Sequence, residues 1–298
     1  MKFLRRLFGK QAPASTPIDP HRPAESSSPA SSPLALLFLF DALPELQAGP
    51  LSEGVAASGA LAAPLRIFDE VSTDSGQYAH IAFDNHRFRW FGISAPAPED
   101  STQQPISCSH WRQEDKVPLR EHQAHAICWY EGAATDPSEQ MIALLRLAGA
   151  FSRSGLVGVV DTDAWNCMPV SVLVQMLEPG MLATCRQEVP VGLWTGFVKL
   201  FKSDDEVWFC TKGFHRWGIR DFAFFGAHHE ADHISGLFAG LFHYLLRSGA
   251  RLEAGHTAQF GGHFLRFGPV TEYADYIQGP LGTLVIEKTQ ASEPPASR

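Results

Sequence analysis

The chain of 298 residues lacks a long hydrophobic run, and its longest purely apolar stretch is the seven-residue segment 34–40. A membrane-crossing helix needs about 20 apolar residues, so we expect no transmembrane segment. The basic start, 1–10, has its apolar residues interrupted by Arg5 and Arg6. It therefore does not have the pattern of a signal peptide.

Cysteine is scarce, and no two cysteines have the CxxC spacing of a zinc ribbon or redox motif. An odd number of cysteines in so long a chain does not indicate a disulfide framework. Reduced, mostly buried thiols, as in a cytoplasmic protein, are the expectation. The five are Cys108, Cys128, Cys167, Cys185 and Cys210.

Basic residues are too few to balance the acidic ones, and the net charge is −8. Residues 1–33 carry +3, which leaves −11 on the remaining 265 residues. Such an acidic body argues against nucleic-acid binding, which needs a basic face. It is compatible with a basic protein partner, and equally with an ordinary acidic enzyme.

Several common catalytic motifs are absent. The sequence has no G-x-S-x-G nucleophile elbow, no phosphate-binding P-loop and no glycine fingerprint for a dinucleotide. These absences remove the best-known serine hydrolase, nucleotide hydrolase and dehydrogenase patterns from consideration.

Both ends of the chain have the composition of disordered segments. Residues 11–33 include six Pro and six Ser, and residues 288–298 are similarly polar. The sequence thus predicts a disordered basic and Pro/Ser-rich tail over 1–33, a folded domain over 34–287, and a second tail over 288–298.

Hydrophobic periodicity within 34–287 predicts a mixture of strands and single helices. The polar, proline-containing stretch 94–120 is expected to be a long loop. The strongest helices are 137–154, which begins with the N-cap Asp136, and 231–248, which ends at Gly249. The expected strands are 34–40, 65–71, 78–83, 88–93, 124–130, 156–160, 193–201, 207–211, 221–225 and 282–287, and weaker helices are expected at 51–61 and 169–177.

This order of elements predicts an α+β fold, with mixed or antiparallel sheets and a few packed helices. The order strand–helix–hairpin–helix can be laid over the chain twice, on 34–155 and on 156–287. Two similar halves are therefore one arrangement of this single domain, although no residue-level repeat supports a duplication.

Five segments between about residues 119 and 287 carry a family resemblance. They are His122-Gln-Ala-His125-Ala, Gly155-Leu-Val-Gly158-Val, Leu193-Trp-Thr-Gly-Phe197, Trp208-Phe-Cys-Thr-Lys-Gly-Phe-His-Arg-Trp-Gly-Ile-Arg-Asp221 and Gly279-Pro-Leu-Gly-Thr-Leu-Val285. In these the chain resembles bacterial domain-of-unknown-function family 4261. The resemblance implies an intracellular bacterial α+β protein and carries over no activity and no catalytic residues.

The sharpest catalytic candidate is the HExxH sequence His229-Glu230-Ala231-Asp232-His233. On a helix, the two histidines share a face and can bind Zn²⁺, while Glu230 can serve as the base for a metal-bound water. Glu253 is a candidate third ligand. The opposing interpretation is a polar helix start, because Glu230 and Asp232 would complement the helix dipole there.

A second group with metal-binding residue types is Cys108, His110, His122 and His125. Four such side chains within 18 residues can indicate structural zinc. Because the CxH spacing is unusual for zinc, we expect these histidines to form local hydrogen bonds instead.

The third candidate is a loop over 211–221 that places polar and aromatic side chains between glycines. Its binding-loop candidates are Lys212, His215, Arg216, Trp217, Arg220 and Asp221. Glycines allow a backbone to approach a ligand closely, and these residue types are common in recognition sites. The alternative is a plain turn in which Asp221 pairs with Arg216 or Arg220.

Taken together, these features favour a non-enzymatic, cytoplasmic interaction module of adaptor or toxin-neutralising type, with no catalytic residue, metal or cofactor and with a basic protein as partner. The alternative hypothesis is a zinc-dependent hydrolase that uses His229, His233 and Glu253 as ligands and Glu230 as base. The two hypotheses differ in metal content and in whether the protein is found with a partner.

Overall fold

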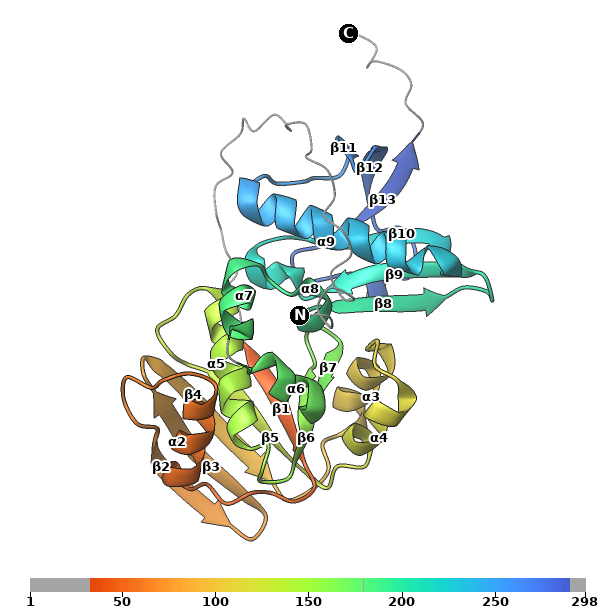
Figure 1. Cartoon of the computed structure of the whole chain (residues 1–298). Helices are drawn as coiled ribbons and strands as arrows, with labels where there is room; N and C mark the ends of the chain where they lie inside the picture. Colours follow the sequence, from red (N-terminus) through yellow and green to blue (C-terminus); the bar gives the residue numbers. More distant parts are fainter. Residues whose placement is uncertain (1–32, 179, 290–298) are drawn as a thin grey trace. The chain divides into compact units, whose positions relative to one another are not determined.

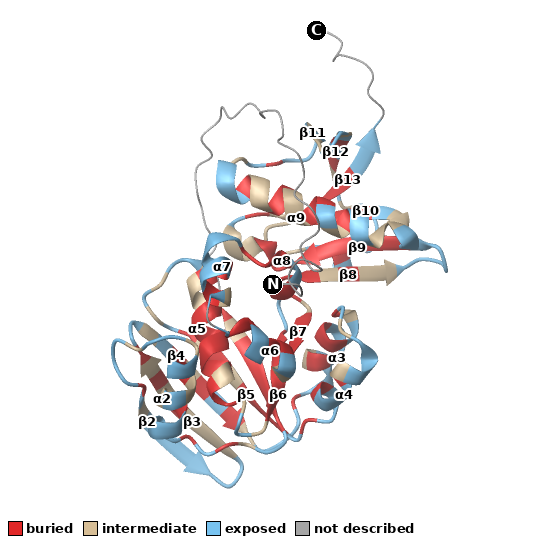
Figure 2. Cartoon of the chain, in the orientation of Figure 1, coloured by how far each residue is buried: buried red, intermediate tan, exposed pale blue. Residues whose placement is uncertain are grey.

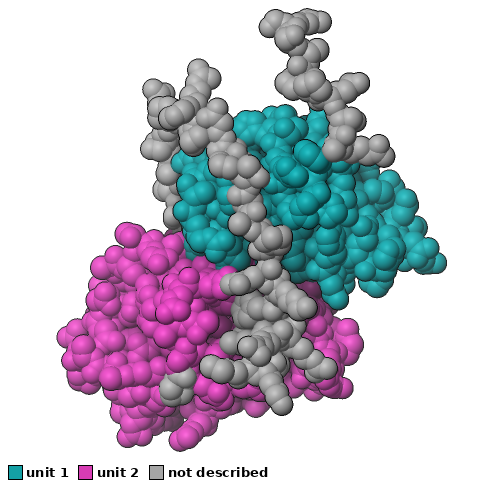
Figure 3. Space-filling model, turned by 45° about the horizontal axis from the view of Figure 1, so that its top comes forward, with its two compact units in different colours: residues 1–28, 197–298 teal, residues 29–196 magenta. Residues whose placement is uncertain are grey.

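The structure is a computed structural model and describes residues 33–178 and 180–289. The chain divides between Gly196 and Phe197 into two compact units (Figure 3). We call residues 33–196 the N-terminal unit and residues 197–289 the C-terminal unit. Each unit combines helices with a mostly antiparallel sheet, which confirms the predicted α+β class (Figure 1).

The sheet of the N-terminal unit has seven strands in the order β2-β3-β4-β5-β1-β6-β7. All of its neighbouring pairs are antiparallel. The first strand of the chain therefore lies inside the sheet, between β5 and β6. The strands are β1 (Ala35–Phe40), β2 (Arg66–Thr73), β3 (Gly76–Phe83), β4 (His86–Ile93), β5 (Ala124–Tyr130), β6 (Leu156–Asp161) and β7 (Asn166–Pro169).

Aromatic side chains build the core on one face of this sheet. Phe38 and Phe40 each make edge-to-face contacts with Trp90 and Phe151, and Trp90 stacks on Phe151 at 5.0 Å between ring centroids. All four side chains are fully buried, and the residues of the nearby strand β6 are buried along its whole length (Figure 2). Large aromatic groups remove much apolar surface from water, so the burial of this cluster stabilises the unit.

Helices α2 (Ala48–Ala57) and α5 (Pro137–Ala150) pack on each other beside this core. Gly54 makes their close approach possible, because a Cβ there would lie 2.6 Å from the Cα of Ala150. The carboxylate of Asp136 caps α5 by accepting the Ser138 N–H at 2.8 Å, and Pro137 occupies the first turn. Three short helices follow later in the unit: α6 (Val170–Met176), α7 (Met181–Gln187) and α8 (Val191–Trp194).

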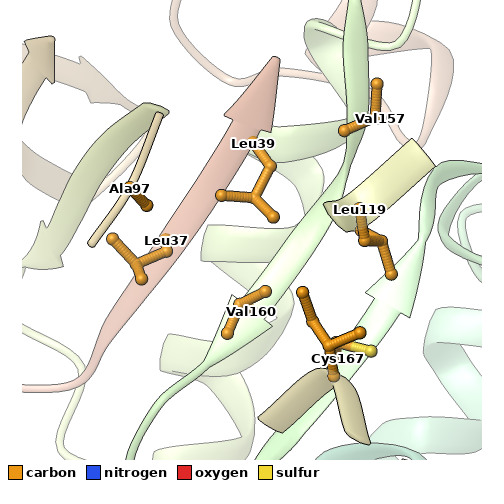
Figure 4. Packing of buried hydrophobic residues seen from close by; sticks show 8 residues of the cluster. Leu37, Leu39, Ala97, Leu119, Val157, Val160 and Cys167 are labelled. Carbon is orange, nitrogen blue, oxygen red and sulfur yellow. The ribbon is translucent and has the colours of Figure 1, made fainter. Parts of the chain in front are cut away.

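The other face of the sheet is covered at one end by α3 (Glu99–Cys108) and α4 (Gln113–Arg120), which pack over β6 and β7. A second apolar cluster lies under these helices (Figure 4). It consists of Leu37, Leu39, Ala97, Ile106, Leu119, Val157, Val160 and Cys167.

The sheet of the C-terminal unit has the order β11-β12-β13-β10-β9-β8, with one parallel pair, β10 and β13. The long helix α9 (Ala231–Ser248) is amphipathic and buries Ile234, Leu237, Phe238, Leu241, Phe242 and Leu245. Gly249 ends it in the left-handed conformation. The other elements are β8 (Gly196–Phe201), β9 (Glu206–Lys212), η1 (Phe214–Trp217), β10 (Asp221–Ala227), η2 (His228–Glu230), β11 (Thr257–Phe260), β12 (His263–Pro269), α10 (Ala274–Ile277) and β13 (Thr283–Thr289).

Three expectations from the sequence need correction. The stretch 94–120 is not a loop, because most of it forms α3 and α4. The last strand continues to Thr289, so the C-terminal tail does not begin at residue 288. The two compact units meet after Gly196, whereas the halves considered from the sequence meet after residue 155.

The remaining tail expectations, over 1–32 and 290–298, lie outside the described residues. Within the described ranges, every helix is too short or too polar to cross a lipid bilayer.

Candidate functional site

The predicted binding loop connects β9 to β10 and folds around a buried phenylalanine. Gly213 and Gly218 have φ values of 99° and 70°, a region that glycine adopts without strain, and they flank the short helix η1. Between them Phe214 packs on Phe242 at 4.7 Å and on Phe222 at 6.0 Å between ring centroids. The loop therefore has its own small core.

Asp221 is the centre of the loop's hydrogen bonding. Its Oδ1 accepts hydrogen bonds from the Thr211 hydroxyl at 2.9 Å and from the Phe214 N–H at 3.2 Å. The Thr211 hydroxyl also accepts the Phe222 N–H at 2.9 Å. Oδ2 has no hydrogen-bond partner among the described residues and faces the Cα of Gly279, where a Cβ would overlap it.

Burial raises the pKa of Asp221 to about 6. The hydrogen bonds from Thr211 and Phe214 and the nearby charges of His215 and Lys212 oppose this effect and favour the carboxylate. Desolvation wins because the side chain is completely enclosed. Asp221 is therefore a group that gains or loses its proton just below neutral pH.

The other loop candidates divide into two sets. Lys212 is buried and donates to the carbonyl of Gln278 at 3.0 Å, while Arg220 lies 3.7 Å from Glu253. These two and Asp221 are thus engaged within the C-terminal unit. His215, Arg216 and Trp217 are half-buried on η1, and the ring of Trp217 lies edge-on to that of Phe242 at 5.3 Å between centroids.

The HExxH sequence straddles the start of α9. His228–Glu230 form the turn η2, and the α-helix begins at Ala231. Glu230 accepts the Ala227 N–H at 3.0 Å through Oε2 and the Lys288 ammonium at 3.1 Å through Oε1. The Ala227 hydrogen bond, followed by Lys288, holds the pKa of Glu230 below its usual value. To serve as a catalytic base, Glu230 would have to leave both partners.

The candidate metal ligands occupy separate local environments. His229 and His233 are both exposed, and the ring of His233 lies edge-on to that of His263 at 5.4 Å. Glu253 pairs with Arg220. Across residues 33–178 and 180–289, no three His, Cys, Asp or Glu side chains are grouped so that they could hold a metal ion.

In the second metal candidate, His122 and His125 form the local hydrogen bonds that the sequence predicted, and the ring of His110 lies 4.1 Å from that of Trp111. His122 bonds through Nδ1 to the carbonyl of Leu119 at 2.7 Å, and its Nε2 accepts the Ala97 N–H at 2.8 Å. These two bonds fit a neutral ring, and burial lowers the pKa of His122 accordingly. His125 bonds to the carbonyl of Ala95 at 2.8 Å. Both histidines thus fix the segment that precedes α3.

A small pocket of about 20 Å³ lies in the N-terminal unit, lined mainly by apolar side chains such as Leu36, Met141 and Trp194. Its polar lining includes Asn166, whose amide donates to the carbonyls of Leu193 and Thr195. This amide therefore has the structural task of holding α8 against β7.

The acidic charge of the described chain belongs almost entirely to one unit. Residues 33–196 contain nine Lys and Arg against nineteen Asp and Glu, a net charge of −10. Residues 197–289 contain nine against ten, a net charge of −1. The sequence gives these numbers only once the boundary at Gly196 is known, which is why sequence reasoning missed the asymmetry.

Sequence reasoning also missed an open sheet face on β2–β5. Its outward side chains alternate with core residues, as in Tyr78, His80 and Ala82 on β3 and Arg87, Arg89 and Phe91 on β4. The signal that could have found it is the nature of these outward residues. Solvent-facing strand positions are usually polar, whereas Tyr78 and Phe91 are aromatic and Arg87 and Arg89 are arginines.

No protein-family model, curated protein or solved structure matches the chain. The resemblance to family 4261 therefore stays a prediction from the sequence.

Proposed function

We propose that this protein is a non-enzymatic interaction module, of adaptor or toxin-neutralising type, that binds a basic protein in the bacterial cytoplasm. The observation that carries the proposal is the net charge of −10 on the N-terminal unit beside −1 on the C-terminal unit. All five cysteines are free thiols and four of them are buried, which supports a reducing compartment.

A charge excess of this size acts mainly on the rate of association. Complementary charge raises the rate at which a partner reaches the correct surface by about 10- to 1,000-fold at low salt. At physiological salt the screening length is about 8 Å, so only charges close to the partner contribute. A basic partner should therefore bind quickly to the N-terminal unit, and this binding should weaken as salt is added.

The test begins with co-purification of the tagged full chain from its own cells, followed by stopped-flow association with the purified partner. Two variants with the same change in net charge separate the units. One neutralises exposed carboxylates of the N-terminal unit by Glu99→Gln, Asp100→Asn, Glu114→Gln and Glu121→Gln. The other does the same in the C-terminal unit by Asp204→Asn, Asp205→Asn, Glu206→Gln and Glu287→Gln.

We expect the first variant to lower the association rate by about tenfold and the second to change it by less than about twofold. Equal effects would contradict the role of the N-terminal unit. A protein that repeatedly purifies alone, or with an acidic partner only, would contradict the proposed function itself.

A further inference from the structure

The register of β2–β5 places the outward side chains in three rows that cross the strands. The pairings Arg66–Ala82, Ala82–Arg87 and Phe88–Tyr130 define the alignment, and the β-bulge between Phe68 and Val71 keeps β2 in phase on this face. The first row is Arg66, Ala82, Arg87 and Glu131; the second is Phe68, His80, Arg89 and Trp129; the third is Val71, Tyr78, Phe91 and Ile127.

This aromatic–arginine face, which we define as these twelve residues, is open over β2–β4. Val71 is 60% exposed and Phe91 is 43% exposed, high values for large apolar side chains. At the β5 end, Ile127 packs against the buried cluster under α3 and α4. The helices that cover the sheet there pack over β6 and β7. Apolar side chains gathered on one open face are typical of a docking surface.

The side chains of the middle row are held in place before any partner arrives. The Arg87 guanidinium lies 5.1 Å above the ring of Phe68, which stacks on His80 at 5.3 Å and 17°. Arg89 lies 4.6 Å above the ring of Trp129. Arginine and aromatic side chains dominate the energetics of protein interfaces, and their prior ordering reduces the entropy lost on binding.

The charges that remain available on this face are positive. Glu131 lies 3.2 Å from Arg89 and 3.6 Å from His80, and Asp69 lies 3.1 Å from the same histidine. Arg66 and Arg87 are exposed and form no ion pair with any carboxylate of the described residues. Two strand spacings separate them, about 10 Å.

We propose that the aromatic–arginine face binds an acidic segment of a protein that also carries apolar side chains. Its carboxylates lie against Arg66 and Arg87 in the first row, and its apolar side chains cover Val71 and Phe91 in the third. The net charge of −10 does not prevent this, because screening limits the relevant charges to those within about 8 Å. This surface is separate from the binding of a basic partner, and an adaptor requires two such surfaces.

The test uses the full chain and a fluorescein-labelled peptide of about twelve residues made of Glu, Asp, Leu and Trp. Binding is followed by fluorescence anisotropy at physiological salt, and its location by hydrogen exchange over residues 66–93. A peptide with Lys in place of the acidic residues and a single-stranded oligothymidine of similar length are the comparison probes. We expect the acidic peptide to bind and to protect 66–93, and the comparison probes to bind at least tenfold more weakly.

Two matched pairs of variants locate the contacts. Arg87→Glu should weaken the binding of the acidic peptide at least tenfold. Arg153→Glu, which changes an exposed arginine in the turn after α5, should leave the binding unchanged. Phe91→Ser should also weaken peptide binding, whereas Val174→Ser, which changes an exposed valine of α6, should not. The proposal would be overturned if the two variants of either pair had equal effects on peptide binding. It would also be overturned if oligothymidine bound more tightly than the acidic peptide, or if the peptide slowed hydrogen exchange outside residues 66–93. Thermal unfolding of each variant identifies any that has lost its fold, and Arg87→Lys then replaces Arg87→Glu with a smaller expected loss.

Discussion

The buried carboxyl group of Asp221 should make the protein more stable at mildly acidic pH. Its pKa is about 6 in the folded protein, against the ordinary aspartate pKa of 3.8 that represents the unfolded chain. Between these values the folded state holds a proton that the unfolded state has released, so stability decreases as the pH rises through this window. Above about pH 6 the full cost of burying the charge is present.

The size of the effect follows from the two pKa values. A difference of about two units corresponds to about 3 kcal/mol, at 1.36 kcal/mol per unit. Asp221→Asn removes the titration and keeps an oxygen that accepts the bonds from Thr211 and Phe214. Its amide NH₂ replaces Oδ2, and any penalty for that group does not depend on pH.

The assay is urea denaturation of the native protein and Asp221→Asn at several pH values from 4 to 7.5. Other titrating groups cancel in the difference between the two proteins. We expect the native protein to lose about 2.4 kcal/mol relative to the variant between pH 4 and pH 7, because part of the titration of the unfolded chain lies below pH 4. Asp204→Asn, at an exposed position between β8 and β9, is the control and should give a constant difference. If the free energies of unfolding of the native protein and Asp221→Asn changed in parallel with pH, the argument from the burial of Asp221 would be refuted.

Three further predictions concern stability and metal content. Arg146→Ala should destabilise the protein by about 3–5 kcal/mol in urea denaturation, because this buried guanidinium donates three hydrogen bonds to the end of α2; an effect below about 1 kcal/mol would contradict that role. Gly279→Ala should lower the free energy of unfolding by about 1–3 kcal/mol, because the added methyl group overlaps Asp221. Gly236→Ala, which has open space around it on α9, should raise the free energy of unfolding by up to about 1 kcal/mol. Protein purified without a His-tag should contain well under one zinc per chain by plasma mass spectrometry; about one zinc, lost in His233→Ala, would favour the zinc hydrolase instead.

The elements that could be predicted from the sequence are those whose residues carry their own signal. The strand 35–40 is a continuous apolar run, 124–130 is apolar except for His125, and helices α5 and α9 have a cap and an apolar stripe. Helices α3 and α4 could not be predicted, because each contains a proline and they are mostly polar. Tertiary contacts stabilise them instead: buried Lys116 of α4 donates to the carbonyls of Ser107 and Ser109 at the end of α3.

In the candidate sites, too, only the features that depend on neighbouring residues could be predicted from the sequence. The polar helix start at Glu230 follows from local sequence, and the structure shows its carboxylate bonded to Ala227. The burial of Asp221 depends on Gly279, which lies far along the chain on the way to β13. The aromatic–arginine face depends on the register of four strands, which no local pattern of residues specifies.

The interior position of β1 has a consequence for synthesis on the ribosome. This strand consists only of apolar residues and is made before its neighbours β5 and β6. At roughly 5–20 residues per second, the interval between Phe40 and Ala124 lasts on the order of 4–17 s. During this time the apolar strand lacks its neighbours on both edges, so we expect residues 34–40 of the nascent chain to be a binding site for a chaperone.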